Sequence, residues 1–333
     1  MRISELDYEL PQELIAQRPA EPRDSSRLMV VDAESGEISH HVFRELPEFL
    51  GEGDALVLNE TKVIPARLYA RRPGGGRVEL LFLREEGEGW EVLARPSKRL
   101  RIGLVLEAGG EKLEVVESRG EGRWILRGDD VSALLEREGH MPLPPYIEST
   151  PEAERSYQTV YARNPGSAAA PTAGFHFTER VLDDVERRGV EIARITLHVG
   201  VGTFTPVRTE RVEEHRMHSE EYHVPEAAAR TIERARRVVG VGTTVARTLE
   251  SWAQTGRRSG ESDLYIYPGY RWQALDVLVT NFHLPRSTLL AMIMSFVGSK
   301  ELIQEAYTLA VKERYRFYSF GDAMLILNGG RNR

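Results

Sequence analysis

Residues 238–254 read VVGVGTTVARTLESWAQ, and this stretch decides the fold of the chain. The apolar run 238–241 predicts a short buried strand, and residues 244–254 predict a helix that follows directly after a glycine turn. The turn lacks the lysine of a phosphate-binding loop and the third glycine of a dinucleotide-binding fingerprint. The stretch therefore indicates one strand–helix unit, and it supports neither ATP hydrolysis nor nicotinamide binding.

The same alternation of strand and helix continues on both sides of this stretch. Before it, helices are predicted over residues 178–188 and 225–237, with a strand over residues 190–199 between them. After it, a strand is predicted over residues 274–279 and an apolar helix over residues 289–297. Alternating units of this kind predict an α/β domain with a largely parallel sheet.

Residues 56–127 follow a different pattern, because short alternating apolar runs are separated there by glycines. Such period-two runs predict a small antiparallel sheet or a barrel. The first sixty residues resemble the α/β part again. We therefore predict a discontinuous α/β main domain, residues 1–61 and 151–333, into which a smaller β-rich, barrel-like domain of residues 62–150 is inserted.

The composition excludes several classes of protein. The 44 basic and 51 acidic residues give a formal net charge of −7, which argues against a protein that coats nucleic acid indiscriminately. There is no cysteine, which excludes disulfides, cysteine-held zinc or iron–sulfur clusters and a thiolate nucleophile. The N-terminus lacks the apolar core of a signal peptide, and the longest apolar stretch, residues 289–298, is shorter than the about 20 residues of a membrane span. We therefore expect a cytoplasmic protein without a membrane partner.

Two segments of the predicted β-rich domain carry basic residues and no acid. Residues 61–78 and 94–106 interrupt an otherwise acidic chain in this way. Acid-free basic segments are typical of a face that contacts nucleic-acid phosphates, although scattered solvated arginines would give the same composition. The candidate phosphate-binding residues are Lys62, Arg67, Arg71, Arg72, Arg95, Lys98 and Arg99.

Three loops combine small residues with polar and ring-bearing ones, a composition that lets a ligand approach the backbone closely. They are residues 166–178, 195–206 and 280–288, and their histidines are His176, His198 and His283. The third loop follows a predicted strand, at the edge where open α/β sheets bind ligands. An ordinary packed turn would explain the small residues, but it explains Asn281, His283 and Arg286 together less well.

A fourth polar segment, residues 215–223, holds three of the nine histidines. His215, His218 and His223 invite a metal-site interpretation. Their spacing is not that of a His-Glu-x-x-His helix, however, and no open three-ligand zinc set is evident. We therefore expect no metal and interpret the segment as a polar loop that faces a substrate.

These segments together closely resemble the S-adenosylmethionine:tRNA ribosyltransferase-isomerase family of queuosine biosynthesis. The resemblance covers nearly the whole chain and also includes four further motifs. They are Tyr8-Glu9-Leu10-Pro11, Leu14-Ile15-Ala16-Gln17, Leu58-Asn59-Glu60-Thr61-Lys62-Val63 and the C-terminal motif Tyr315-Arg316-Phe317-Tyr318-Ser319-Phe320-Gly321-Asp322-Ala323-Met324. No single motif is decisive, but so many of them in the family's order leave little room for coincidence.

The resemblance implies a specific reaction. The ribosyl part of S-adenosylmethionine is transferred to 7-aminomethyl-7-deazaguanine at the wobble position of a tRNA, and adenine and methionine leave as epoxyqueuosine forms. This chemistry needs no metal. It needs a base that removes a proton next to the sulfonium, and an acid near adenine would help adenine to depart. The sequence does not say whether the chain works as a monomer, and a monomer is kept as an expectation.

The matching positions suggest roles for individual residues. For proton transfer we expect His176, His198 and His283, with Glu250 as a weaker candidate because it could pair with Arg247 instead. For S-adenosylmethionine we expect Thr172, Gly174, Gly200, Gly202, Gly240, Gly242, Thr243, Thr244 and Asn281. For the tRNA we expect the seven basic residues of the β-rich domain together with His218 and Arg286.

Three other functions stay open at this point. An RNA methyltransferase would also use S-adenosylmethionine in an α/β domain, but it would release S-adenosylhomocysteine. A tRNA-binding module without catalysis would keep the basic segments but would not need three polar histidine loops. A metal-dependent hydrolase built on His215, His218 and His223 would lose its activity to chelators.

Overall fold

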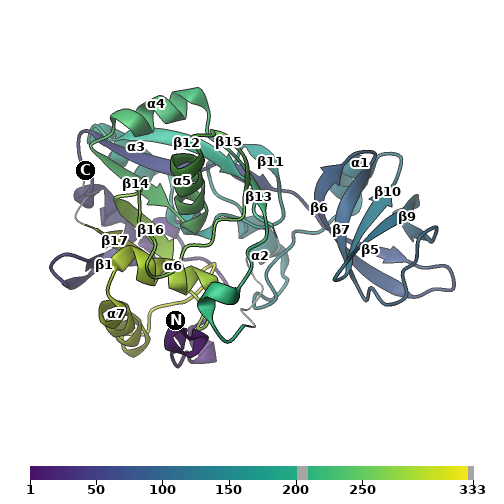
Figure 1. The fold of residues 1–333 in the computed structure, drawn as a ribbon, viewed down its shortest axis with the longest axis horizontal. Helices are drawn as coiled ribbons and strands as arrows, with labels where there is room; N and C mark the ends of the chain where they lie inside the picture. Colours follow the sequence, from purple (N-terminus) through teal and green to yellow (C-terminus); the bar gives the residue numbers. More distant parts are fainter. Residues whose placement is uncertain (201–208, 329–333) are drawn as a thin grey trace.

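A computed structural model describes residues 1–200 and 209–328 of the chain. It consists of a large α/β body and a β-barrel set to one side of that body (Figure 1). The predicted fold class, an α/β main domain with a smaller barrel-like domain, is confirmed. No helix within the two described ranges is long and apolar enough to cross a membrane.

The body is built on a mixed sheet with the strand order β15-β13-β12-β3-β14-β16-β17-β1-β2. The strands are β1 (Arg27–Asp32), β2 (Ile38–Val42), β3 (Asp54–Asn59), β12 (Glu191–Leu197), β13 (Glu220–His223), β14 (Arg237–Val241), β15 (Ser259–Ser262), β16 (Val277–Asn281) and β17 (Ala323–Leu327). The four central strands, from β12 to β16, run parallel as expected. On either side of them the pairs β12–β13, β13–β15, β16–β17 and β1–β2 are antiparallel, and β1 pairs in parallel with β17.

Helices cover both faces of this sheet (Figure 1). One face carries α4 (Glu226–Arg234), α5 (Thr243–Thr255), α6 (Thr288–Val297) and α7 (Lys300–Lys312), and the other carries α3 (Glu179–Arg187) with the 3-10 helix Phe43–Phe49. Successive residues of β3 serve the two faces in turn: Val57 packs with the first group and Leu58 with the second. A strand covered on both faces is a continuous apolar run, as β3 is.

Shorter helices complete the body. They are α2 (Pro151–Ser156) and the 3-10 helices Ile3–Leu6, Gln12–Leu14, Arg23–Ser25, Thr172–His176 and Val212–Glu214. Thr172–His176 matters for the site, because it lies beside the end of β16.

The barrel closes in the strand order β10-β7-β6-β5-β8-β9. Its strands are β5 (Arg67–Arg71), β6 (Arg77–Glu86), β7 (Gly89–Arg95), β8 (Val105–Ala108), β9 (Glu111–Gly120) and β10 (Arg123–Arg127), followed by α1 (Val131–Glu138). It has its own apolar core, in which Leu80 and Leu106 are fully buried and Leu134 of α1 packs against the strands. Closure of the sheet leaves it without a free edge.

Two chain segments connect the barrel to the body, and they run close together. β4 (Thr61–Val63) leads toward the barrel and pairs in parallel with β11 (Asn164–Ser167), which follows the return. At the barrel itself, Arg67 and His140 exchange two backbone hydrogen bonds of 3.1 and 2.8 Å. We therefore propose that residues 62–150 form an inserted domain and that residues 1–61 and 151–333 form the other.

Candidate active site

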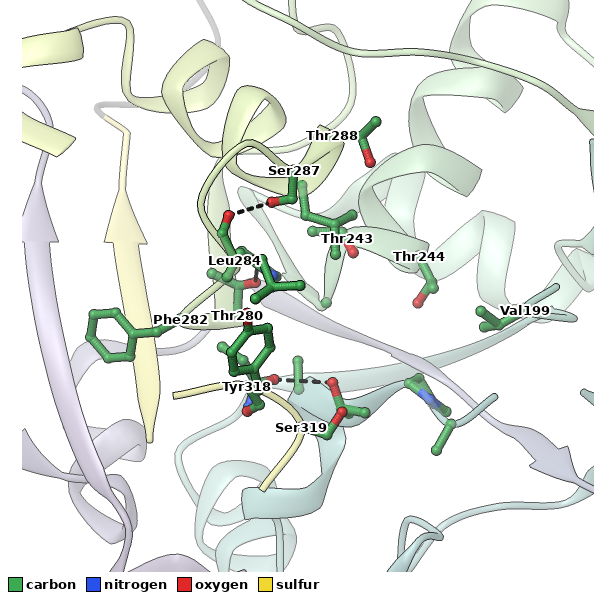
Figure 2. A pocket seen from close by; sticks show the side chains of 18 of the residues that line it. Val199, Thr243, Thr244, Thr280, Phe282, Leu284, Ser287, Thr288, Tyr318 and Ser319 are labelled. Carbon is green, nitrogen blue, oxygen red and sulfur yellow. Dashed lines mark hydrogen bonds between the residues drawn. The ribbon is translucent and has the colours of Figure 1, made fainter. Parts of the chain in front are cut away.

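A cavity of about 190 Å³ opens at the carboxyl ends of β14 and β16, where parallel sheets bind ligands (Figure 2). Three segments that are distant in sequence line it: the start of α5, the loop between β16 and α6, and the 3-10 helix that begins at Thr172. The aromatic residues Tyr146 and Tyr318 close one side. Arg286 is the only charged residue among the described residues that line the cavity, and it is paired with Asp7.

The N-terminus of α5 points a free set of backbone N–H groups at this cavity. Gly242, the residue before the helix, has φ 91°, a conformation that a residue with a Cβ adopts only at a cost. No side chain caps the helix, so the donors of its first turn remain for a ligand. The N-terminus of α6 also adjoins the cavity, but the Ser287 hydroxyl caps it by accepting from the Leu290 N–H.

His283 contributes an imidazole ring to the cavity lining. The loop holds the residue firmly: its N–H donates to the Tyr307 hydroxyl at 3.0 Å, and its carbonyl accepts from the Tyr8 hydroxyl. Its Nε2 lies 2.8 Å from the Thr280 hydroxyl, which leaves Nδ1 without a hydrogen-bond partner among the described residues. Burial lowers the pKa of His283 to about 3, so the ring is neutral at pH 7.

A second, larger cavity of about 1180 Å³ lies between the barrel and the body. Its barrel side includes Arg84 and Trp90, and its body side includes His198 and Glu221. Val199 lines both this interdomain cleft and the first cavity, so the two spaces adjoin there.

His198 lies at the wall of the cleft in a defined orientation. Its Nδ1 lies 2.8 Å from the hydroxyl of the buried Thr61, which leaves Nε2 without a partner in the described part of the chain. Gly166 lies against the ring, and a Cβ at that position would approach it to 2.9 Å. Burial lowers the pKa of His198, and the negative charge of Glu221 opposes that shift. The ring is therefore neutral at pH 7.

Charged side chains bridge the cleft from barrel to body. Arg84 of β6 bonds Glu261 of β15 at 3.0 Å and also Glu91 of the barrel at 3.0 Å. Arg123 of β10 bonds His218 at 2.9 Å. These contacts link the barrel to the body across the cleft.

The structure separates the expected site residues into three groups. The first cavity is lined by Thr172, Gly242, Thr243, Thr244, Asn281, His283 and Arg286. The cleft is lined by Lys62, His198, Gly200 and His218. The residues that line neither space are Gly174, His176, Gly240, Glu250, Arg67, Arg71, Arg72, Arg95, Lys98 and Arg99, and Gly202 lies outside the described residues.

The expected alternative pairing of Glu250 with Arg247 is wrong. The Glu250 carboxylate instead accepts from the Ala274 N–H at 2.8 Å and from the Tyr270 hydroxyl at 2.9 Å, which anchors the loop before β16. Burial raises its pKa, while these hydrogen bonds act in the opposite direction. Arg247 pairs with Glu220, and both side chains are only 4% exposed.

Two of the expected glycines serve packing. A Cβ at Gly174 would lie 2.0 Å from the Tyr161 hydroxyl, and one at Gly240 would lie 2.6 Å from a methyl group of Leu275. Both positions therefore need glycine to let two elements approach.

Three residues of the cavity wall were not singled out from the sequence. The rings of Tyr146 and Tyr318 lie 4.6 Å apart, and the Tyr146 hydroxyl is 2.8 Å from that of Ser319. Figure 2 shows Tyr318 and Ser319 beside the loop after β16. Tyr318 and Ser319 belong to the C-terminal motif Tyr315–Met324, and Tyr146 ends a proline-rich run. These segments were recognisable in the sequence, but no binding role was predicted for the three residues.

Metal-binding side chains are not gathered anywhere in residues 1–200 and 209–328. No three histidines, aspartates or glutamates in these ranges are arranged to hold an ion. His215, His218 and His223 therefore do not form the three-ligand set that the hydrolase alternative requires.

Residues 3–326 match the sequence pattern of the family described as queuosine biosynthesis protein. The chain belongs to the queuosine biosynthesis protein family. Among its relatives, the S-adenosylmethionine:tRNA ribosyltransferase-isomerase of Rubrobacter xylanophilus is 74% identical over 100% of this chain and 99% of its own. The enzyme of the same name from Moorella thermoacetica is 54% identical over 98% of this chain and 100% of its own.

A solved structure supports membership of the queuosine biosynthesis family. The crystal structure of S-adenosylmethionine tRNA ribosyltransferase from Thermotoga maritima matches with a TM-score of 0.58 and 40% identity. The match covers 97% of this chain and 100% of the other. The likeness therefore extends over nearly the whole of both chains.

Proposed function

We propose that this protein is an S-adenosylmethionine:tRNA ribosyltransferase-isomerase. It transfers and isomerises the ribosyl part of S-adenosylmethionine onto 7-aminomethyl-7-deazaguanine at the tRNA wobble position, releases adenine and methionine, and forms epoxyqueuosine. The observation that carries this proposal is 74% identity, over the whole chain, to a relative that bears this name. The methyltransferase and binding-module alternatives have no comparable support.

S-adenosylmethionine is proposed to bind in the first cavity. The uncapped N-terminus of α5 suits the methionine carboxylate, because free N–H groups and the helix dipole both favour an anion. Hydroxyl and amide groups from Thr172, Thr243, Thr244 and Asn281 suit the ribose. No carboxylate is among the described residues that line the cavity, so we propose that the tyrosine rings contact the positively charged sulfonium.

The acceptor base is proposed to enter the interdomain cleft. This space is several times larger than the first cavity and meets it at Val199, so a base in the cleft could approach a ribose in the cavity. His198 and Lys62 line the cleft near this junction. A base that leaves its stack to reach such a pocket is the usual solution for enzymes that modify nucleobases.

His283 and His198 are proposed as the proton-transfer groups of the reaction. Each ring is neutral at pH 7 and has one nitrogen without a partner among the described residues, so each can accept a proton. One faces the proposed S-adenosylmethionine cavity and the other faces the proposed base cleft. Glu250 is a weaker candidate than before, since its carboxylate is fully occupied by the loop it anchors.

The exposed basic residues of the barrel are proposed to contact tRNA phosphates. Arg95, Lys98 and Arg99 are exposed and have no ion pair in the described chain, so their charge is available. By contrast, the exposed Arg119 is paired with Glu86 and Glu117. Because the substrate is a tRNA, we also propose that the enzyme acts in the cytoplasm. We further propose that it acts as a single chain and without a metal ion.

The decisive experiment incubates the protein with S-adenosylmethionine and a tRNA that carries the aminomethyl base, without added metal. Mass spectrometry is expected to find adenine and methionine in equal amounts, with a matching mass gain on the tRNA. S-adenosylhomocysteine would instead assign the protein to the methyltransferases. A folded protein that binds tRNA without turnover would favour the binding module. His283→Ala and His198→Ala are each expected to lower kcat by about 100-fold, the usual contribution of a general acid or base.

The phosphate contacts need a separate measurement. Arg99→Ala is expected to weaken tRNA binding and to reduce the slope of log K against log salt by about 1, because one counterion fewer is released. Arg119→Ala is the matched control, since that side chain is already neutralised. Equal effects of the two substitutions would count against the proposed phosphate-binding face.

A further inference from the structure

A buried chain of hydrogen bonds lies directly behind the first cavity. His176, which is 3% exposed, places Nδ1 2.8 Å from the Ser26 hydroxyl and Nε2 3.2 Å from Nδ2 of Asn281. Asn281 Nδ2 also donates to the Tyr318 carbonyl at 3.1 Å, and Asn281 Oδ1 accepts from the Thr172 hydroxyl at 3.4 Å. Asn281 and Thr172 line the cavity, whereas His176 does not.

The partners of this chain determine where its protons lie. The Tyr318 carbonyl can only accept, so the atom that faces it is the amide nitrogen of Asn281. The second proton of that nitrogen then points at His176 Nε2, which must be the unprotonated nitrogen of the ring. The ring proton is therefore on Nδ1, and it donates to the Ser26 hydroxyl.

The surroundings keep the ring in this one state. Phe43 lies against it with centroids 5.0 Å apart, so no open face remains on that side. Burial, reinforced by the positive charges of Arg316 and Arg23, lowers the pKa of His176 to about 3. A neutral ring with both nitrogens engaged has no free position from which to take up or release a proton.

We propose that His176 is a positioning residue that fixes the amide of Asn281 so that its oxygen faces Thr172 and the cavity. This inference rests on the proposed function, and it departs from the sequence-based expectation that His176 transfers protons. The amide oxygen and the Thr172 hydroxyl then offer a fixed pair of polar groups to the hydroxyl groups of the bound ribose. A flipped amide would turn its N–H groups there instead.

Two substitutions separate this role from the alternatives. A glutamine at position 176 can place its side-chain oxygen near the position of Nε2 and keep an acceptor for Asn281. An asparagine at the same position reaches only the place of Nδ1, so it keeps Ser26 as a partner and leaves the Asn281 N–H unpaired. We expect His176→Asn to raise KM for S-adenosylmethionine about tenfold, the value of one buried hydrogen bond, with kcat changed much less. His176→Gln is expected to keep a KM close to that of the wild type.

The pH dependence of kcat supplies a second readout. If His176 only positions Asn281, both variants keep the wild-type profile, whereas a proton-transfer role predicts that one limb disappears. The inference would be overturned by a lost limb or by equal KM values for the two variants.

Asn281→Leu provides an independent arm in case His176→Asn folds poorly. In that background His176→Gln and His176→Asn should have the same KM, because the amide they act on is gone. A persisting difference would mean that His176 acts through another group. Failure of the wild-type protein to release adenine and methionine would refute the proposed function itself, and that result is visible before any variant is compared.

Discussion

Acidification is predicted to destabilise the protein through His176, by an amount that the structure defines. The pKa of this ring is lowered from 6.5 to about 3 in the folded state, so between these values the unfolded chain binds the proton and the folded chain does not. Stability from this group is therefore fully present above pH 6.5 and is lost as the pH falls toward 3. From pH 7 to pH 5 the loss is about 2 kcal/mol, since each unit below 6.5 costs about 1.4 kcal/mol.

The measurement is urea-induced unfolding at pH 7 and pH 5, followed by circular dichroism, for the wild type and His176→Gln. Carboxylates titrate equally in both proteins, so the difference between their losses isolates one ring. We expect the wild type to lose about 2 kcal/mol more than the variant. His223→Gln, at an exposed position, controls for the removal of an imidazole as such. If the two losses agreed within about 0.5 kcal/mol, the folded ring would take up a proton as readily as the unfolded chain does, and the lowered pKa of His176 would be refuted.

Three further outcomes follow from buried or bridging contacts. Arg247→Met removes the cationic partner of the buried Glu220 carboxylate, which keeps its hydrogen bond from the Gly200 N–H, and is expected to lower the free energy of unfolding by about 3–5 kcal/mol, measured in urea. Gly174→Ala forces a Cβ against the Tyr161 hydroxyl and is expected to lower the free energy of unfolding by about 1–3 kcal/mol. In a thermal melt this loss should appear as a Tm lower by several degrees. Arg84→Ala removes a contact across the interdomain cleft, and small-angle scattering is expected to show a broader distribution of distances between barrel and body.

The sequence was most informative where one segment contains its own signals. The helix predicted over residues 178–188 corresponds to α3 (Glu179–Arg187), because the Thr178 side chain caps its start and Gly189, with φ 78°, follows its end. Thr243, Thr244 and Asn281, which line the first cavity, were among the residues singled out from the sequence, since they lie at the ends of two apolar strands and the carboxyl ends of parallel strands meet at one edge.

Features that depend on partners distant in sequence were not predictable in the same way. The edge strand β15 has the sequence Ser-Gly-Glu-Ser, which contains no apolar alternation and forms a strand only through its pairing with β13. Tyr146 reaches the cavity from a segment 172 residues before Tyr318, whose ring it contacts. Nothing in the sequence near either residue predicts this contact. His176 and His283 look alike in sequence, yet packing turns one toward the core and the other toward the cavity.

The way in which the barrel is attached bears on how such an enzyme can change over time. Its entrance and exit lie side by side at Arg67 and His140, and its apolar core is its own. Removing residues 68–139 and joining the two ends with a short turn would leave the sheet of the body uninterrupted. The barrel therefore has the properties of an exchangeable domain. Substitutions on its surface can change which nucleic acid it contacts, while the residues of the body that line the first cavity stay the same.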